Sequence, residues 1–296
     1  MKRTHLFIVI LVLAGTILTA YFPFNKINFS NARNNNVCKA LKGDVLLYIV
    51  FVDSKTTSPW TEFDIQTTMD SIKITVSWLE AKAREQGINL NIKTDFYVGD
   101  NFSTVKRDLP EGTVRQSVTY PNLQKGVENM NKWADNVSRK AGESFDVPNK
   151  DGIPEIKNPR NKERLVAFLR DQHKVESIGV LFFVNNYYRD DISVTLNTLN
   201  SNDIEYSVIS YKYPAVIAHN ILHLFGAADL HETPFRKSDK AINYALQEFP
   251  DDIMLNPYAK PLSTRSIGAF TSYLINWCDT LNPKHEFLLE EKGIKL

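Results

Sequence analysis

Apolar runs and segments of helical periodicity alternate along the first part of the chain. Residues 45–52 form an uninterrupted apolar run, which is typical of a strand that is covered on both faces. Apolar side chains recur at helical spacing over residues 62–84, and residues 88–98 alternate as a second strand does. This order of elements predicts an α/β (α+β) protein in which helices pack on a sheet.

The pattern continues with two more helical segments and two more strands. Residues 122–139 and 161–174 have helical spacing, and the second segment carries many charges that we expect on a solvated face. Residues 177–184 form another buried strand, whereas residues 192–199 form a more polar strand that fits the edge of a sheet. We therefore expect one large folded unit over residues 44–282, followed by a tail at 283–296.

The N-terminal region predicts export. Lys2 and Arg3 precede an uncharged apolar run over residues 6–20, which continues through aromatic residues to Phe24. If the run ends at residue 20, it has the length of the apolar part of a secretory signal. If it extends to residue 24, it has the ~20 residues that a helix needs to cross a bilayer. Both interpretations of residues 1–24 place the rest outside the cytoplasm, either secreted or anchored in the membrane through residues 6–24, in the periplasm or at the cell surface. Residues 25–43, rich in asparagine, are expected to form a tether.

Composition narrows the classes of function. The chain has 296 residues, of which 43% are hydrophobic, so it has ample material for a core. Its formal net charge of +1 gives no electrostatic basis for binding nucleic acid. The two cysteines, Cys38 and Cys278, lie near opposite ends of the chain, and the sequence leaves open whether they form a disulfide or stay free.

The strongest chemical signal lies between residues 216 and 231. His219 and His223 are four residues apart, so on a helix both imidazoles share one face and can bind one ion. Gly226 follows three residues later and can end the helix in a sharp turn that returns Asp229 toward that ion. Two imidazoles and a carboxylate, with a fourth position open, form the ligand set of a catalytic zinc site. Random placement would give the whole pattern in roughly a few sequences per ten thousand.

The sequence leaves two alternatives to this ligand set open. Large apolar residues surround the histidines, so the segment also fits a core helix whose imidazoles hydrogen-bond to the backbone. His231, two residues beyond Asp229, is a second candidate for the third ligand if Asp229 turns away. The core-helix interpretation leaves the spacing of the glycine and the aspartate unexplained.

With these residues the chain resembles the metzincin clan of zinc metallopeptidases. The clan's signature is His-Glu-x-x-His-x-x-Gly-x-x-His, or with aspartate in the last place, followed by a methionine turn. The matching positions in this chain are His219, His223, Gly226 and Asp229. The resemblance implies that Met254 forms an apolar floor under the metal and that residues 263–277 form a closing C-terminal helix. It also implies a mixed twisted sheet, bound Zn²⁺, and a peptide or protein as substrate or ligand.

One position departs from the clan's pattern. The clan has a glutamate directly after the first histidine, which accepts a proton from the metal-bound water, and this chain has Asn220 there. An asparagine amide cannot accept that proton, and general acid–base catalysis contributes about 10²–10⁴-fold to a rate. The side chains that are candidates to replace the glutamate are His231, Glu232, Asp251 and Asp252.

Two hypotheses about function follow from this departure. The first is an exported zinc metallopeptidase that acts on peptides or proteins, in which Asn220 is tolerated or compensated. The second is a catalytically inactive relative that keeps the fold and binds a polypeptide by strand addition, along an edge such as residues 192–199. Chelator-sensitive cleavage of peptides distinguishes the two hypotheses.

Overall fold

The computed structural model describes residues 27–28, 33, 36–97, 104–110, 112, 114, 123–147, 152–154, 156–185, 192–196, 204–210, 212–233 and 238–291. Within these ranges, no helix is both long enough and apolar enough to cross a membrane. Residues 6–24, where the sequence predicts a signal or an anchor, lie outside the described part of the chain.

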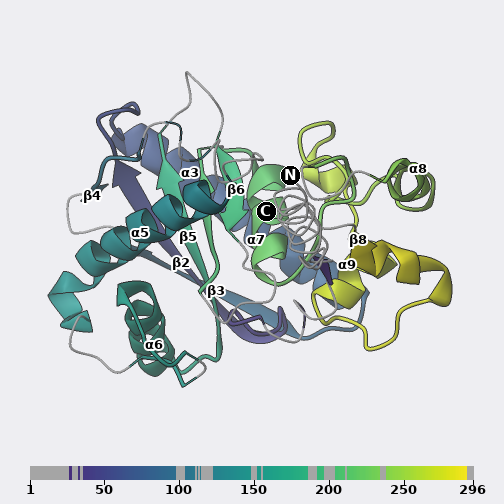
Figure 1. Ribbon diagram of the computed structural model, residues 1–296, viewed down its shortest axis with the longest axis horizontal. Helices are drawn as coiled ribbons and strands as arrows, with labels where there is room; N and C mark the ends of the chain where they lie inside the picture. The colour runs from purple at the N-terminus through teal and green to yellow at the C-terminus, as the bar shows by residue number, and fades with distance from the viewer. Residues whose placement is uncertain are drawn as a thin grey trace, which may run out of the picture.

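Strands and helices are mixed along the chain (Figure 1). The first elements are β1 (Ile27–Asn28), β2 (Gly43–Asp53), α3 (Glu62–Glu85), β3 (Leu90–Tyr97), β4 (Val105–Lys106), α5 (Leu123–Gly142), η1 (Glu143–Phe145) and α6 (Asn161–His173). The later elements are β5 (Ser177–Val184), β6 (Ser193–Leu196), β7 (Tyr206–Ile209), α7 (Pro214–Leu224), α8 (Asp239–Glu248), η3 (Leu262–Thr264), α9 (Ala269–Leu274), η4 (Pro283–Leu289) and β8 (Glu290–Glu291).

The main sheet is mixed and mostly parallel. Its strand order is β3-β2-β5-β7-β6, and the short strand β4 also pairs with β2. The pairs of β2 with β3, β4 and β5, and of β5 with β7, are parallel, whereas β6 pairs with β7 antiparallel. Strand β6 therefore forms an edge of the sheet, as the polar pattern of residues 192–199 predicts. Separately, β1 pairs with β8 in a two-stranded antiparallel sheet.

A hydrophobic core lies on each face of the sheet, because successive side chains of a strand point to opposite sides. Residues Leu47 and Phe51 of β2 pack with α3 and α7, while Leu46 and Val50 pack with α5 and α6. Figure 1 shows α5 and α6 at the left of the sheet and the elements from α8 onward at the right, beyond α7. Burial on both faces explains why residues 45–52 of β2 form an uninterrupted apolar run.

Most elements predicted from the pattern are confirmed within a few residues. They are the strands now called β2, β3, β5 and β6 and the helices α3, α5 and α6. Strand β7 is not predicted, because a run of four residues between two turns is too short to show a period. The structure places it beside β5, where it joins the edge strand β6 to the parallel part of the sheet.

The expected C-terminal helix over residues 263–277 is wrong in length. Helix α9 spans only Ala269–Leu274 and begins after Gly268. Asp252 explains the difference, because its carboxylate accepts hydrogen bonds from the Gly268 N–H and the Thr271 hydroxyl, both at 2.8 Å. The residues before α9 are therefore held in an extended bridge and the short helix η3, rather than in a continuous α-helix.

The packed core also includes residues outside the expected range of 44–282. Buried hydrophobic side chains beyond its limits are Val37, Cys38, Leu41 and Leu288. Cys38 and Cys278 are both free thiols in this structure. The segment expected to be a tether thus ends in residues that pack into the core.

Candidate metal centre

Helix α7 carries the two histidines, and its sequence explains where it begins and how deeply it lies. Pro214 occupies the start of the helix, where its missing N–H has no intrahelical partner in any case. Because apolar side chains surround the helix, it packs against α3 and against strands β6 and β7. The side chains of His219 and His223 are consequently only 8% and 16% exposed.

The helix ends in a turn at Gly226. This residue has a φ of 103°, a conformation that residues with a Cβ rarely adopt. The N–H of Ala227 bonds back to the Leu222 carbonyl oxygen at 3.0 Å, which satisfies one of the free carbonyl groups at the end of the helix. Beyond this turn the chain returns and brings Asp229 next to the histidines.

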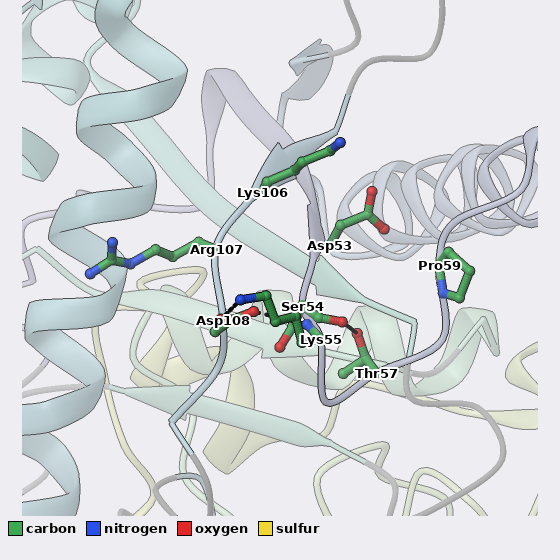
Figure 2. Close-up of a pocket in the computed structure, with 8 residues that line it drawn as sticks. All are labelled: Asp53, Ser54, Lys55, Thr57, Pro59, Lys106, Arg107 and Asp108. Carbon is green, nitrogen blue, oxygen red and sulfur yellow. Dashed lines mark hydrogen bonds and ion pairs between the residues drawn. The ribbon is translucent and has the colours of Figure 1, made fainter.

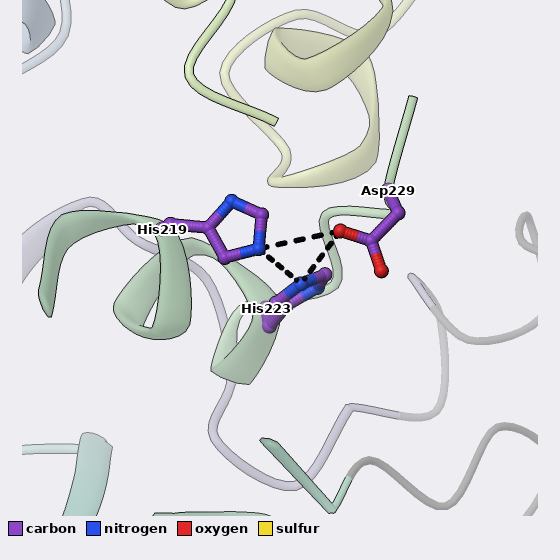
Figure 3. Close-up of side chains that lie close together, drawn as sticks. All are labelled: His219, His223 and Asp229. Atoms are coloured by element: carbon purple, nitrogen blue, oxygen red, sulfur yellow. Dashed lines mark hydrogen bonds and ion pairs between the residues drawn. The ribbon is translucent and has the colours of Figure 1, made fainter. Parts of the chain in front are cut away.

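The three side chains of the motif meet at one point, and we call them the His-His-Asp cluster (Figure 3). The Nε2 atoms of His219 and His223 are 3.0 Å apart, and Asp229 Oδ1 lies 3.3 and 3.2 Å from them, respectively. Within the described ranges, these are the His, Cys, Asp or Glu side chains whose ligand atoms lie close enough to share one ion. The sequence spacing of the motif thus becomes proximity in space.

The backbone fixes which nitrogen of each imidazole faces the cluster. His219 Nδ1 lies 3.2 Å from the Ile253 carbonyl oxygen, and His223 Nδ1 lies 2.9 Å from the Ala227 carbonyl oxygen. A carbonyl oxygen only accepts hydrogen bonds, so each Nδ1 carries a proton. In a neutral ring, Nε2 then presents its lone pair to the cluster, and hydrogen bonds of this kind orient imidazoles that bind metals.

The separations within the cluster fit a zinc ion. In a tetrahedral site with nitrogen and oxygen ligands about 2.0–2.1 Å from zinc, the ligand atoms lie about 3.3 Å from one another. The observed separations are 3.0, 3.2 and 3.3 Å. Buried Asp229 Oδ1 also has no well-aligned hydrogen-bond donor in the described part of the chain, which is costly unless a cation compensates it.

The electrostatics of the cluster favour a cation. Burial alone would raise the pKa of Asp229, but His223 and His219 hold that pKa well below its usual value. Burial lowers the pKa of His219, and His223 lowers it further. Burial also opposes the charged form of His223, but the Asp229 carboxylate raises its pKa overall. The two imidazoles thus favour the charged form of the Asp229 carboxylate, and a bound cation would compensate that charge.

The turn that contains Met254 lies against the cluster. Met254 is fully buried, and its carbonyl oxygen accepts a hydrogen bond from the Leu230 N–H at 3.0 Å. Asp252 closes the turn by accepting from the Met254 N–H at 2.8 Å. Met254 thus adjoins the segment that carries Asp229, which is compatible with the floor expected of it.

Asn220, at the position of the clan's glutamate, is 1% exposed, and its amide is fully engaged. Its Nδ2 donates to Ser193 Oγ and to the Val216 carbonyl oxygen, both at 2.8 Å. Its Oδ1 accepts from Thr195 Oγ1 at 3.1 Å. The side chain thus joins α7 to the edge strand β6.

The sequence alone does not identify Ser193 and Thr195 as partners of Asn220. Both hydroxyls belong to β6, and Thr195 also bonds to Ser207 Oγ on β7 at 2.7 Å. The one signal available in the sequence is the alternation of polar residues along β6, which predicts a shared face but not what that face contacts.

His231 lies beside the cluster without completing it. Its Nδ1 is 3.6 Å from Asp229 Oδ1 and 3.3 Å from the Met254 carbonyl oxygen. The side chain whose ligand atom groups with the two histidines is Asp229, which does not turn away. Of the candidates to replace a catalytic glutamate, His231 is thus the one that the structure brings next to a proposed ligand.

The carboxylates considered as replacements have other environments. Asp252 is fully buried and accepts the hydrogen bonds that hold the Met254 turn and the start of α9. Asp251 lies at the surface and pairs with Lys260 at 2.6 Å, and Glu232 is exposed. The structure gives neither Asp251 nor Asp252 a contact with the cluster.

A separate cavity of about 830 Å³ lies at the carboxyl ends of β2 and β4 (Figure 2). Its lining residues are Asp53, Ser54, Lys55, Thr57, Pro59, Lys106, Arg107 and Asp108. The acidic groups here hold loops, since Asp53 accepts from the Trp60 N–H and Asp108 from the Lys55 N–H. No histidine is among these residues, so the cavity does not resemble the cluster chemically.

Comparisons with family models, with curated proteins and with solved structures find no match for this chain. The chemistry of the cluster and of its surroundings is therefore what indicates a function.

The Gly226 turn gives a direct test of how the cluster is built. A Cβ at this position would lie 3.0 Å from the Leu274 carbonyl oxygen, and the φ of 103° is unfavourable for alanine. We expect Gly226→Ala to lower the free energy of unfolding by about 1–3 kcal/mol and to weaken zinc binding. Urea denaturation and zinc titration measure the two effects.

Gly87→Ala is the matched control for this substitution. Gly87 also has a positive φ, of 72°, but a Cβ there would meet nothing within 4 Å. The Gly87→Ala variant should therefore have a lower free energy of unfolding, because its backbone is strained, but should bind zinc as tightly as the wild type. Equal zinc affinities of the two variants would contradict the role of the Gly226 turn.

Proposed function

We propose that this protein is an exported, metallopeptidase-like zinc protein whose metal is held by His219, His223 and Asp229. The observation that carries the proposal is the convergence of two imidazole nitrogens and one carboxylate oxygen, at 3.0–3.3 Å from one another. Zinc in such a site polarises a carbonyl group and lowers the pKa of a bound water. The residues of the chain orient the ligands through the Ile253 and Ala227 carbonyl groups.

A peptide or protein is the ligand that we propose for this site. Strand β6 is an edge of the sheet, and an extended polypeptide can add to an edge strand by main-chain hydrogen bonds. The side chains of Ser193 and Thr195 connect β6 directly to α7, the helix that carries the histidines. A polypeptide on this edge would thus lie next to the helix that holds the proposed metal.

The contacts of Asn220 favour a second candidate, a relative that binds polypeptides and hydrolyses them slowly or not at all. The amide cannot accept a proton from water, and its hydrogen bonds fix it to β6 and to the Val216 carbonyl group. Proton transfer at this position is therefore lost, which typically lowers a rate by about 10²–10⁴-fold. Among the candidate replacements, His231 is the one for which the described part of the chain has a contact with the cluster.

Metal content tests the proposal. Full-length protein equilibrated with zinc and then desalted should carry about one zinc ion per chain, measured by elemental analysis. His219→Ala should lose this zinc, because it removes one of the three ligands. His173→Ala serves as control. His173 is the last residue of α6, and its Nε2 lies 3.0 Å from Oδ2 of Asp95 on strand β3, which is not part of the cluster. Folded wild-type protein that retains no zinc would contradict the proposed function.

A further inference from the structure

The C-terminal end of α7 is covered by residues from the start of the described chain. Leu41 is fully buried, its carbonyl oxygen accepts from the Trp277 indole N–H at 2.6 Å, and the Ala40 carbonyl oxygen accepts from Ser177 Oγ at 3.0 Å. We call residues 36–41 the N-terminal strap. It lies in the region that the sequence predicts to be an asparagine-rich tether.

Asn36 connects this strap to the helix of the cluster. Its Nδ2 donates to the carbonyl oxygen of Leu224, the last residue of α7, at 2.9 Å. Its Oδ1 accepts from the Cys38 N–H at 2.7 Å, which fixes the amide in place. The last carbonyl groups of a helix have no partner within the helix, so this contact satisfies one of them with a side chain.

The same segment covers the Gly226 turn. A Cβ built on Gly226 would lie 3.8 Å from Asn36 Nδ2, 3.9 Å from Arg33 Cα and 3.0 Å from the Leu274 carbonyl oxygen. The guanidinium carbon Cζ of Arg33 lies 4.3 Å from the centre of the Tyr273 ring. Its Nη2 donates a hydrogen bond to the Cys278 carbonyl oxygen at 3.1 Å. The turn is thus enclosed on one side by the N-terminal residues and on the other by the end of α9.

The position of this turn determines where Asp229 lies relative to the histidines. His223 precedes Gly226 by three residues and Asp229 follows it by three, so a shift of the turn moves the carboxylate against the imidazoles. His223 Nδ1 also bonds to the Ala227 carbonyl group directly after the turn. A contact that fixes the turn therefore fixes both the separation of the ligands and the orientation of one ring.

We propose that the N-terminal strap positions the metal cluster, with Asn36 as the positioning residue. This inference rests on the proposed zinc site, since it concerns how tightly that site binds its ion. Removal of a hydrogen bond that orients metal ligands typically weakens metal affinity by about 10–100-fold. The proposal thus links the segment that follows the N-terminal apolar region to the function of the site.

The test compares zinc affinity with stability in matched asparagine variants of the full chain. Asn36→Ala removes the contact with Leu224, and Asn36→Asp removes the donor while keeping an acceptor for the Cys38 N–H. Asn185→Ala is the control, because Asn185 is similarly buried and its Nδ2 donates to the Pro59 carbonyl oxygen, also at 2.9 Å. Asn185 follows β5 at the carboxyl end of the sheet and has no contact with the cluster.

Zinc affinity is measured by competition with a chromophoric chelator, and stability by urea denaturation of the metal-free proteins. We expect both Asn36 variants to bind zinc about tenfold more weakly than wild type, and Asn185→Ala to keep wild-type affinity at a similar loss of stability. Wild-type affinity in Asn36→Asp, or an equal loss of affinity in Asn185→Ala, would overturn the positioning role alone. Absence of zinc binding in the wild type would instead overturn the proposed function.

Discussion

Zinc is expected to raise the thermal stability of this protein strongly. A ligand at about a thousand times its dissociation constant stabilises the folded state by about 4 kcal/mol, provided that the unfolded chain does not bind it. For a domain of this size, that corresponds to a rise in Tm of about 10 °C. Asp229→Ala should abolish the rise, because it removes the charged ligand whose pKa is held well below its usual value. Differential scanning calorimetry with and without zinc measures it.

Asp70→Ala controls for the loss of a negative charge. Asp70 lies on the exposed face of α3, where it pairs with Lys73 at 3.0 Å, so its removal should leave the zinc-dependent rise intact. A rise of equal size in Asp229→Ala would mean that zinc stabilises the protein elsewhere. The proposed ligand set would then be incorrect, whatever the metal content of the wild type.

The fold was predictable where one physical signal dominates. Strand β2 lies between two cores, and its residues 45–52 therefore form a continuous apolar run. Helix α3 has its buried residues at helical spacing, and Thr61 caps its first turn by accepting from the Asp64 N–H. Such elements depend on local spacing and burial, which a single sequence displays.

Elements that depend on a distant contact were not predictable. The apolar residues after position 262 fit a long helix, but the carboxylate of Asp252 binds the Gly268 N–H and sets the start of α9 there. The sequence that leads into the strap at residues 36–41 is polar and rich in asparagine. Even so, Val37 and Leu41 are buried against other parts of the chain. The start of α9 and the burial of the strap thus both depend on contacts with residues outside these segments. Local spacing in the sequence does not reveal such contacts.

The candidate site likewise has one part that the sequence predicts and one part that it does not. The spacing of His219, His223 and Asp229 predicts their proximity, because helix geometry and a glycine turn translate sequence distance into position. The side-chain direction of Asn220 is not encoded in spacing. It follows from the hydroxyl groups that β6 presents to α7, and β6 reaches that place through the unpredicted strand β7.

Asn220→Glu is expected to produce chelator-sensitive peptide hydrolysis that the wild type lacks. A carboxylate at this position supplies the proton acceptor that the amide cannot, and the expected gain is about 10²-fold or more. The substitution should also lower the free energy of unfolding by about 1–3 kcal/mol, because it removes two N–H donors from a side chain that is 1% exposed. Mass spectrometry of a mixed peptide pool detects the cleavage.

Asn220→Gln isolates the chemical cause of this gain. Glutamine has the length of glutamate and disturbs the packing against Ser193 and Thr195 in a similar way, but it has no proton-accepting carboxylate. Cleavage by the glutamate variant alone would therefore assign the missing step to proton transfer at residue 220. Strong chelator-sensitive cleavage by the wild type would contradict the inactive relative and would direct attention to His231, whose Nδ1 lies 3.6 Å from Asp229 Oδ1. A zinc-loaded glutamate variant without cleavage would instead contradict the assignment of the missing step to residue 220.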